Sequence, residues 1–138
     1  MPQRPASEWR QPTPLDAVAD AYLDQTAALS PLSATAMGLG GYDREMDDFS
    51  PEGHAARAEA ARRSLAEARR VASLDAVDQV TAAALAERLS LAVESFEAGD
   101  HLADLNNVAS PLQTVRDVFD LMARRTEDDW ETIAVRMA

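Results

Sequence analysis

Hydrophobic positions recur at intervals of three and four residues along most of the chain from Pro14 onward. This spacing places apolar side chains on one face of a helix, and no segment alternates at period two for long enough to indicate a strand. The pattern therefore predicts an all-α fold, which we expect to be an antiparallel helical bundle of about five helices with no sheet.

Polar residues that favour helix N-termini mark where the helices are expected to begin, and proline follows several of them. Their side chains accept hydrogen bonds from free backbone N–H groups, and proline suits the first helical position because it lacks an N–H. The predicted helix starts follow Thr13, Ser30, Ser50, Asp75, Ser110 and Thr126. Gly38 and Gly99 are predicted to end two of these helices, and the helix after Ser50 is predicted to end near Ala72.

The segment that ends at Gly99 carries apolar residues around a wide arc, which predicts contact with two partners. Tyr22, Phe96, Phe119 and Trp130 stand at helical spacing and are predicted to lie in the core. The last helix reaches Ala138 without a residue that would end it. We therefore expect residues 14–138 to be a helical N-terminal domain and a fragment of a longer chain.

The first fourteen residues include four prolines, and residues 1–13 are predicted to be a flexible tail. This segment has no apolar region typical of a signal peptide, and the chain has no run of 18 uncharged apolar residues. The sequence therefore predicts neither a signal peptide nor a membrane-spanning helix.

The net charge and the absence of cysteine exclude several classes of function for this chain. The 24 acidic residues outnumber the 13 basic ones, which are all arginine, and the net charge is -11. An evenly acidic chain lacks the cationic face that nucleic acid requires, and anionic membranes repel it, so we expect neither partner. Because cysteine is absent, no disulfide, thiolate nucleophile or cysteine-bound zinc can form, which fits a cytoplasmic location.

Residues that could hold a metal are sparse. His54 is followed by two alanines and therefore does not begin the H-E-x-x-H pattern of zinc hydrolases, and His101 with Asp104 lacks further ligands nearby. The acidic run from Asp43 to Asp48 fails the EF-hand spacing, because position six is not glycine. We therefore expect no catalytic residue, no metal ligand and no cofactor in this segment.

Three stretches of the chain are LDAVADAYLDQTAALSPLSATAMGLGGYD, DDFSPEG and DDWETIAVRMA. Together they resemble the amino-terminal part of the domain-of-unknown-function family 885, large helical proteins similar to zinc metallopeptidases. The most specific pieces are LSPLSATAMG, followed by Tyr42 and Asp43, and the pair Ser50 and Pro51. The resemblance runs from about Leu15 to Ala138, and it implies that the H-E-x-x-H helix and any zinc lie in a downstream part.

The resemblance implies a non-catalytic helical domain that forms a wall or lid of a substrate cleft, with the remainder of its own chain as partner. The loop from Gly38 to Asp48 is then expected to be a mobile rim. Tyr42, Asp43, Asn106 and Asn107 are the candidate rim residues, although paired asparagines also suit a turn or a cap. The alternative is a stand-alone acidic helical module for interaction or oligomerisation, and we expect the isolated fragment to self-associate.

Overall fold

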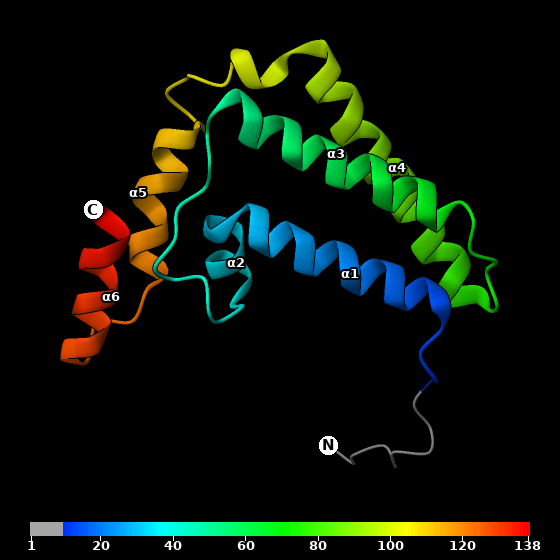
Figure 1. The fold of residues 1–138 in the computed structure, drawn as a ribbon, viewed down its shortest axis with the longest axis horizontal. Coiled ribbons are helices and arrows are strands. Elements are labelled where there is room, and N and C mark those ends of the chain that lie inside the picture. The colour runs from blue at the N-terminus through cyan, green and yellow to red at the C-terminus, as the bar shows by residue number, and fades with distance from the viewer. Residues whose placement is uncertain (1–9) are drawn as a thin grey trace.

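The structure, a computed structural model, describes residues 10–138. Helices and loops account for all of this part, and no strand occurs in it. The elements are α1 (Pro14–Leu29), α2 (Pro31–Met37), α3 (Pro51–Ala68), α4 (Ala76–Ala98), the short 3-10 helix η2 (Asp100–Leu102), α5 (Pro111–Leu121) and α6 (Glu127–Met137) (Figure 1). The all-α prediction is confirmed, whereas the expected number of about five helices is wrong, because residues 10–138 form six α-helices.

The predicted helix starts are confirmed. At five of them the N-cap side chain accepts a hydrogen bond from the backbone N–H three residues further on; these are Thr13, Ser30, Ser50, Asp75 and Thr126. At the sixth start, the N–H of Ser110 donates to Oε1 of Gln113 over 3.0 Å. These contacts satisfy backbone groups that have no partner inside the helix.

The predicted helix ends are confirmed at two positions and differ at a third. Gly38 (φ 76°) and Gly99 (φ 80°) adopt the left-handed conformation after α2 and α4. The third helix ends at Ala68 and not near Ala72, because a turn replaces the helix there: the N–H of Arg70 donates to the carbonyl of Glu67, three residues back (2.9 Å).

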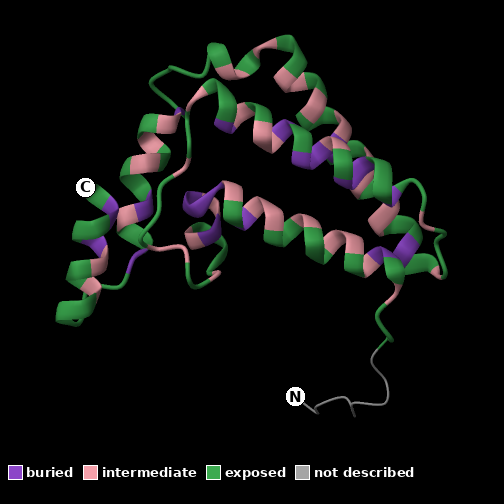
Figure 2. Ribbon diagram, in the orientation of Figure 1, coloured by how far each residue is buried: buried purple, intermediate pink, exposed green. Residues whose placement is uncertain are grey.

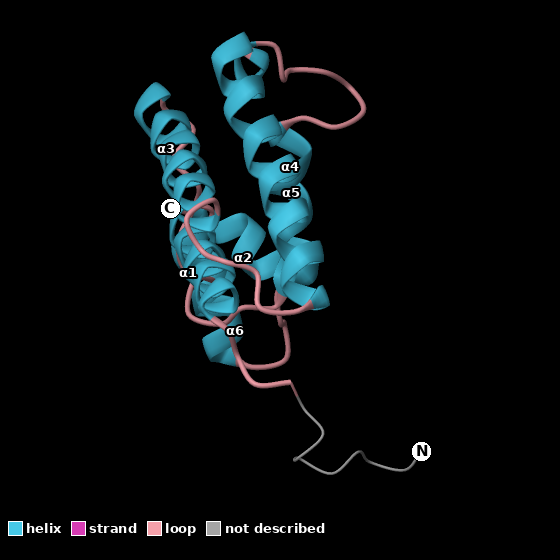
Figure 3. Cartoon of the chain, turned by 90° about the vertical axis from the view of Figure 1, so that its right-hand side faces the viewer, coloured by secondary structure: helices cyan, strands magenta, loops and turns pink. Residues whose placement is uncertain are grey.

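Helix α3 packs along both α1 and α4, and α1 also contacts α4 (Figures 1 and 3). The buried centre of these three helices consists of Ala61, Leu65 and Leu89. Several further alanines of α3 are buried, and buried residues follow that helix in Figure 2. Alanine lets two helices approach closely, but each alanine removes little apolar area from water.

Gly53 lies in the first turn of α3, where glycine costs helix stability relative to alanine. Its position is explained by the loop that leads into the helix, since a Cβ atom there would collide with the backbone carbonyl and the carboxyl group of Asp48. The close approach of the chain therefore requires glycine at this position.

Helix α5 packs on α2, and α6 lies beside them at the end of the molecule away from the α3–α4 turn (Figure 1). Val118, Met122 and Ile133 provide the buried apolar side chains of this part. The prediction of a core position for Trp130 is wrong, since 55% of this residue is exposed. The periodicity that places Trp130 on an apolar face cannot tell a face that is covered from one that is open.

At the opposite end, the fully buried carboxylate of Asp78 joins three segments. It accepts hydrogen bonds from the N–H of Leu74 (2.8 Å), from Oγ1 of Thr13 (2.8 Å) and from the guanidinium of Arg10. Arg10 also pairs with Asp16 and Asp75, at 2.6 Å each. Residues 1–9 of the predicted tail lie outside the described residues, and these contacts join its last four residues to α1 and α4.

Replacement of Asp78 by alanine is expected to lower the free energy of unfolding by about 3 kcal/mol, because a buried N–H and a hydroxyl then lose their acceptor. Urea denaturation measures the loss. Asp120→Ala, which removes an exposed carboxylate of α5, serves as the control and should change stability by less than about 0.5 kcal/mol. Equal effects of the two substitutions would contradict the stabilising role of the buried Asp78 carboxylate.

Candidate functional site

Two of the candidate rim residues, Tyr42 and Asp43, lie in the loop between α2 and α3, where Arg136 of α6 reaches them. The Arg136 side chain is fully buried. Its Nε donates to the carbonyl of Glu45 (2.9 Å), and its Nη2 donates to the carbonyls of Pro31 (3.0 Å) and Tyr42 (3.4 Å). One guanidinium therefore joins the loop and α2 to α6.

The carboxylates of the acidic loop bind α2. Asp43 Oδ1 accepts from Oγ1 of Thr35 (2.7 Å) and lies 3.8 Å from Nη1 of Arg136. Asp47 accepts from Oγ of Ser30 (2.6 Å) and from the N–H of Leu32 (2.9 Å). Burial lowers the pKa of Arg136, and Asp43 and Asp47 act in the opposite direction. The contacts hold residues 42–47 against α2 and α6, and the mobility expected for the loop stays a prediction.

The other two candidate rim residues, Asn106 and Asn107, lie in the loop between η2 and α5. Oδ1 of Asn106 accepts from the N–H groups of Val108 and Ala109, at 2.8 Å each, and Nδ2 donates to the carbonyl of Ala109 (2.8 Å). Asn106 therefore forms a turn, which is one of the two interpretations that its sequence context allows. Neither asparagine lines the hollow of about 360 Å³ to which Asp43 belongs.

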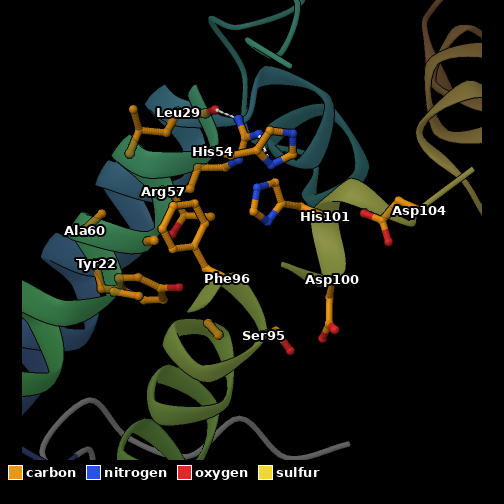
Figure 4. A pocket seen from close by; sticks show the side chains of 14 residues that line it. Tyr22, Leu29, His54, Arg57, Ala60, Ser95, Phe96, Asp100, His101 and Asp104 are labelled. Atoms are coloured by element: carbon orange, nitrogen blue, oxygen red, sulfur yellow. Dashed lines mark hydrogen bonds between the residues drawn. The ribbon is translucent and has the colours of Figure 1, made fainter. Parts of the chain in front are cut away.

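A pocket of about 460 Å³, which the sequence did not indicate, lies between α1, α3, the end of α4 and η2 (Figure 4). Tyr22 and Phe96 provide aromatic surface, and His54, Arg57 and His101 provide polar groups. Figure 4 shows Phe96 between Tyr22 and His101. His54 and His101 are far apart in the sequence, so no local motif could have identified the pair.

The rings of the two histidines lie close together and are tilted relative to each other. Their ring centroids are 4.8 Å apart with an interplanar angle of 31°, and His101 stacks on Phe96 at 4.9 Å and 12°. Nη2 of Arg57 lies 3.2 Å from Nδ1 of His54. Since arginine can only donate, this Nδ1 accepts, and the neutral ring carries its proton on Nε2. Burial, with Arg57 and His101 as further causes, lowers the pKa of His54.

These residues do not fit a zinc ion. A protein zinc site has at least three protein ligands, and Nδ1 of His54 already accepts a hydrogen bond from Arg57. Within residues 10–138, no group of three or more histidine, aspartate or glutamate side chains is placed to hold a metal. We therefore assign no metal chemistry to the His54 and His101 pair.

A second feature is a set of exposed large apolar residues along α4, η2, the loop that follows and the start of α5, here named the outer apolar band. Its members are Val77, Val80, Leu91, Leu102, Leu105, Val108 and Leu112. Val80 is 71% exposed and Leu105 is 78% exposed. The first three share one side of α4 by their spacing, together with Glu87 and Glu94. In Figure 3 the loop between α4 and α5 extends away from the helices.

A sequence profile described as "Bacterial protein of unknown function (DUF885)" matches residues 31–138, which is most of the chain. The chain belongs to this family. The resemblance noted from the sequence is thereby confirmed at the level of the family, and the match leaves α1 outside its range. No curated protein matches the DUF885 chain. Among residues 10–138, no helix has both the length and the apolar character needed to cross a membrane.

Replacement of Arg136 by methionine is expected to cost about 2–4 kcal/mol of unfolding free energy, since several buried carbonyls lose a charged donor. Urea denaturation of the DUF885 chain measures the loss. Arg116→Met, at an exposed arginine of α5, should change stability by less than about 0.5 kcal/mol. If the two variants unfold at the same urea concentration, Arg136 does not hold α6 in place.

The lowered pKa of His54 predicts a stability that falls in mild acid. Histidine in the unfolded chain titrates near pH 6.5, and the folded chain binds this proton less readily. The contribution of His54 to the free energy of unfolding is therefore complete above about pH 6.5 and is lost as the pH falls below that value. The carboxylates with lowered pKa, Asp16, Asp48, Asp75 and Asp129, titrate at lower pH.

The measurement is the urea midpoint from about pH 8 to about pH 5 for the wild-type chain and for His54→Gln. The variant should lose part of the decline that the wild-type chain shows below about pH 6.5. If the urea midpoints of the two proteins fall in parallel as the pH is lowered, His54 is not the cause of the decline.

Proposed function

We propose that this chain is the non-catalytic N-terminal helical domain of a zinc-metallopeptidase-like hydrolase, in which it forms a wall or lid of the substrate cleft. The outer apolar band is the observation that carries the proposal. Exposed apolar residues of this size, gathered on neighbouring elements, are typical of a surface that packs against another part of a protein. The reaction class in this proposal comes from the resemblance to zinc metallopeptidases that we expect of the DUF885 family from the sequence.

The remainder of the same chain is the proposed partner. Helix α4 buries Leu89 against α3 and exposes Val80 and Leu91 on another side, so it has apolar residues for two neighbours. An antiparallel arrangement of α1, α3 and α4 as one bundle would present this open side of α4 as a wall. In the proposal the zinc ion and the catalytic residues belong to the downstream part, and the whole protein is cytoplasmic, in accord with the absence of cysteine.

The second candidate is a stand-alone acidic interaction module. The net charge of -11 favours the form of this candidate that binds a basic partner, because such a charge attracts a cationic surface; it opposes the approach of a second copy at low salt. In the oligomeric version of this candidate, copies of the chain associate through the outer apolar band. Sedimentation of the chain at several protein concentrations and salt concentrations distinguishes a monomer from a self-associated form.

A double substitution, Val80→Glu with Leu91→Glu, tests the leading proposal in the complete gene product. Burying two added charges against the downstream part should lower the melting temperature by several degrees and reduce kcat/KM on peptides at least about tenfold. In the 138-residue chain both positions already face water, so the same change should leave the urea midpoint almost unaltered. Metal analysis of the gene product is expected to find zinc.

Gln79→Glu is the matched control, since it adds a negative charge to an exposed position of α4 outside the outer apolar band. It should change neither the melting temperature nor kcat/KM. The proposal fails if the double variant of the gene product behaves like this control, or if the gene ends at Ala138.

A further inference from the structure

The pocket beside His54 has an apolar interior. Tyr22 and Phe96 line it with aromatic rings, and the alanines at positions 58, 61 and 92 leave space where larger side chains would fill it. Its volume of about 460 Å³ falls within the range usual for small-molecule sites. The interior therefore suits a compact apolar group, either aromatic or branched.

A cation lies at the edge of this apolar space. Nη1 of Arg57 donates to the carbonyls of Asp48 (2.9 Å) and Leu29 (3.4 Å), which fix the guanidinium without neutralising its charge. No carboxylate of residues 10–138 forms an ion pair with Arg57, although acidic residues outnumber arginines almost two to one. The carboxylate of Asp48 acts on Arg57 from a longer distance without pairing with it, so this partly buried cation still favours a directly bound anionic group.

Two imidazole nitrogens at the same place lack partners within the described chain. His54 accepts from Arg57 at Nδ1, which leaves its Nε2–H as a donor. Nδ1 of His101 is buried and makes no hydrogen bond with any group of residues 10–138. The Nε2–H of His54 can therefore donate to a polar group bound beside Arg57, whereas Nδ1 of His101 has almost no surface open to a bound molecule.

The acidic residues of the pocket stand at its outer edge. Asp100 and Asp104 are both exposed, and water and salt screen exposed charges strongly. Their repulsion of an anion at Arg57 is therefore weaker than the direct contact with the guanidinium, which is partly shielded from solvent.

We propose that this pocket binds a small apolar carboxylate, with the carboxylate on Arg57 and His54 and the apolar group against Phe96 and Tyr22. The site uses residues of this chain alone and does not depend on the hydrolase assignment. A neutral apolar compound would leave Arg57 without a directly paired anion, and a small anion would leave the aromatic surface uncovered.

Titration of the 138-residue chain with 3-phenylpropionate, followed by NMR of the isotope-labelled protein and by calorimetry, tests the proposal. A ligand of this size is expected to bind with a Kd of about 0.1–1 mM. The neutral 3-phenylpropanamide should bind at least about tenfold more weakly, because it makes no ion pair with Arg57. Acetate should bind at least about tenfold more weakly as well, because it buries no apolar group.

Arg57→Gln is expected to weaken 3-phenylpropionate binding at least about tenfold. Arg63→Gln, at an exposed arginine of the same helix, should leave the Kd unchanged. Because Arg57 also holds two backbone carbonyls, Ala92→Leu provides a second test that keeps every polar group and fills the pocket; it should abolish binding. Circular dichroism checks that each variant is folded.

The proposal is overturned if 3-phenylpropionate causes no shift of Phe96, His54 or Arg57 signals at about 10 mM. It is also overturned if the acid and the amide bind equally, or if Ala92→Leu binds as the wild-type chain does. Equal binding of acetate would reduce the site to a simple anion contact and would likewise contradict the proposal.

Discussion

Packing through alanine is the constraint on which the rest of the molecule depends. Helix α3 packs against both α1 and α4 with Ala58, Ala61 and Ala68 buried, so the three helices approach closely but remove little apolar area from water for each residue. The structure adds hydrogen-bonded charges at its two ends, Asp78 at one and Arg136 at the other. Larger apolar residues, such as Val80 of α4, stay exposed and form the outer apolar band.

Local features of the fold could be predicted from the sequence. The start after Thr13 and the end at Gly38 depend on residues within one turn of the helix boundary, and for this reason short-range reasoning located them. It was harder to predict which faces of the helices are buried and which are exposed to solvent. Trp130 follows the period of its helix and is nevertheless exposed, since periodicity describes a face and not what covers it.

The candidate site could be predicted only in part. The four rim residues were chosen from loops, and the structure shows Asp43 bound to α2 and Asn106 forming a turn. Arg136 was missed because the carbonyls that it holds lie far from it in the sequence. The pocket with Arg57 was missed for the same reason, as its walls come from three separate segments. Contacts between distant parts of a chain leave no local signal.

Hydrogen exchange tests the central claim, that the outer apolar band faces the remainder of the same protein. The measurement compares backbone amides of residues 76–112 in the 138-residue chain and in the complete gene product. The account predicts that amides along the loop after η2 and the exposed side of α4 exchange at least about tenfold more slowly in the gene product, because a packed surface opens less often. Equal exchange rates in the two proteins would contradict it.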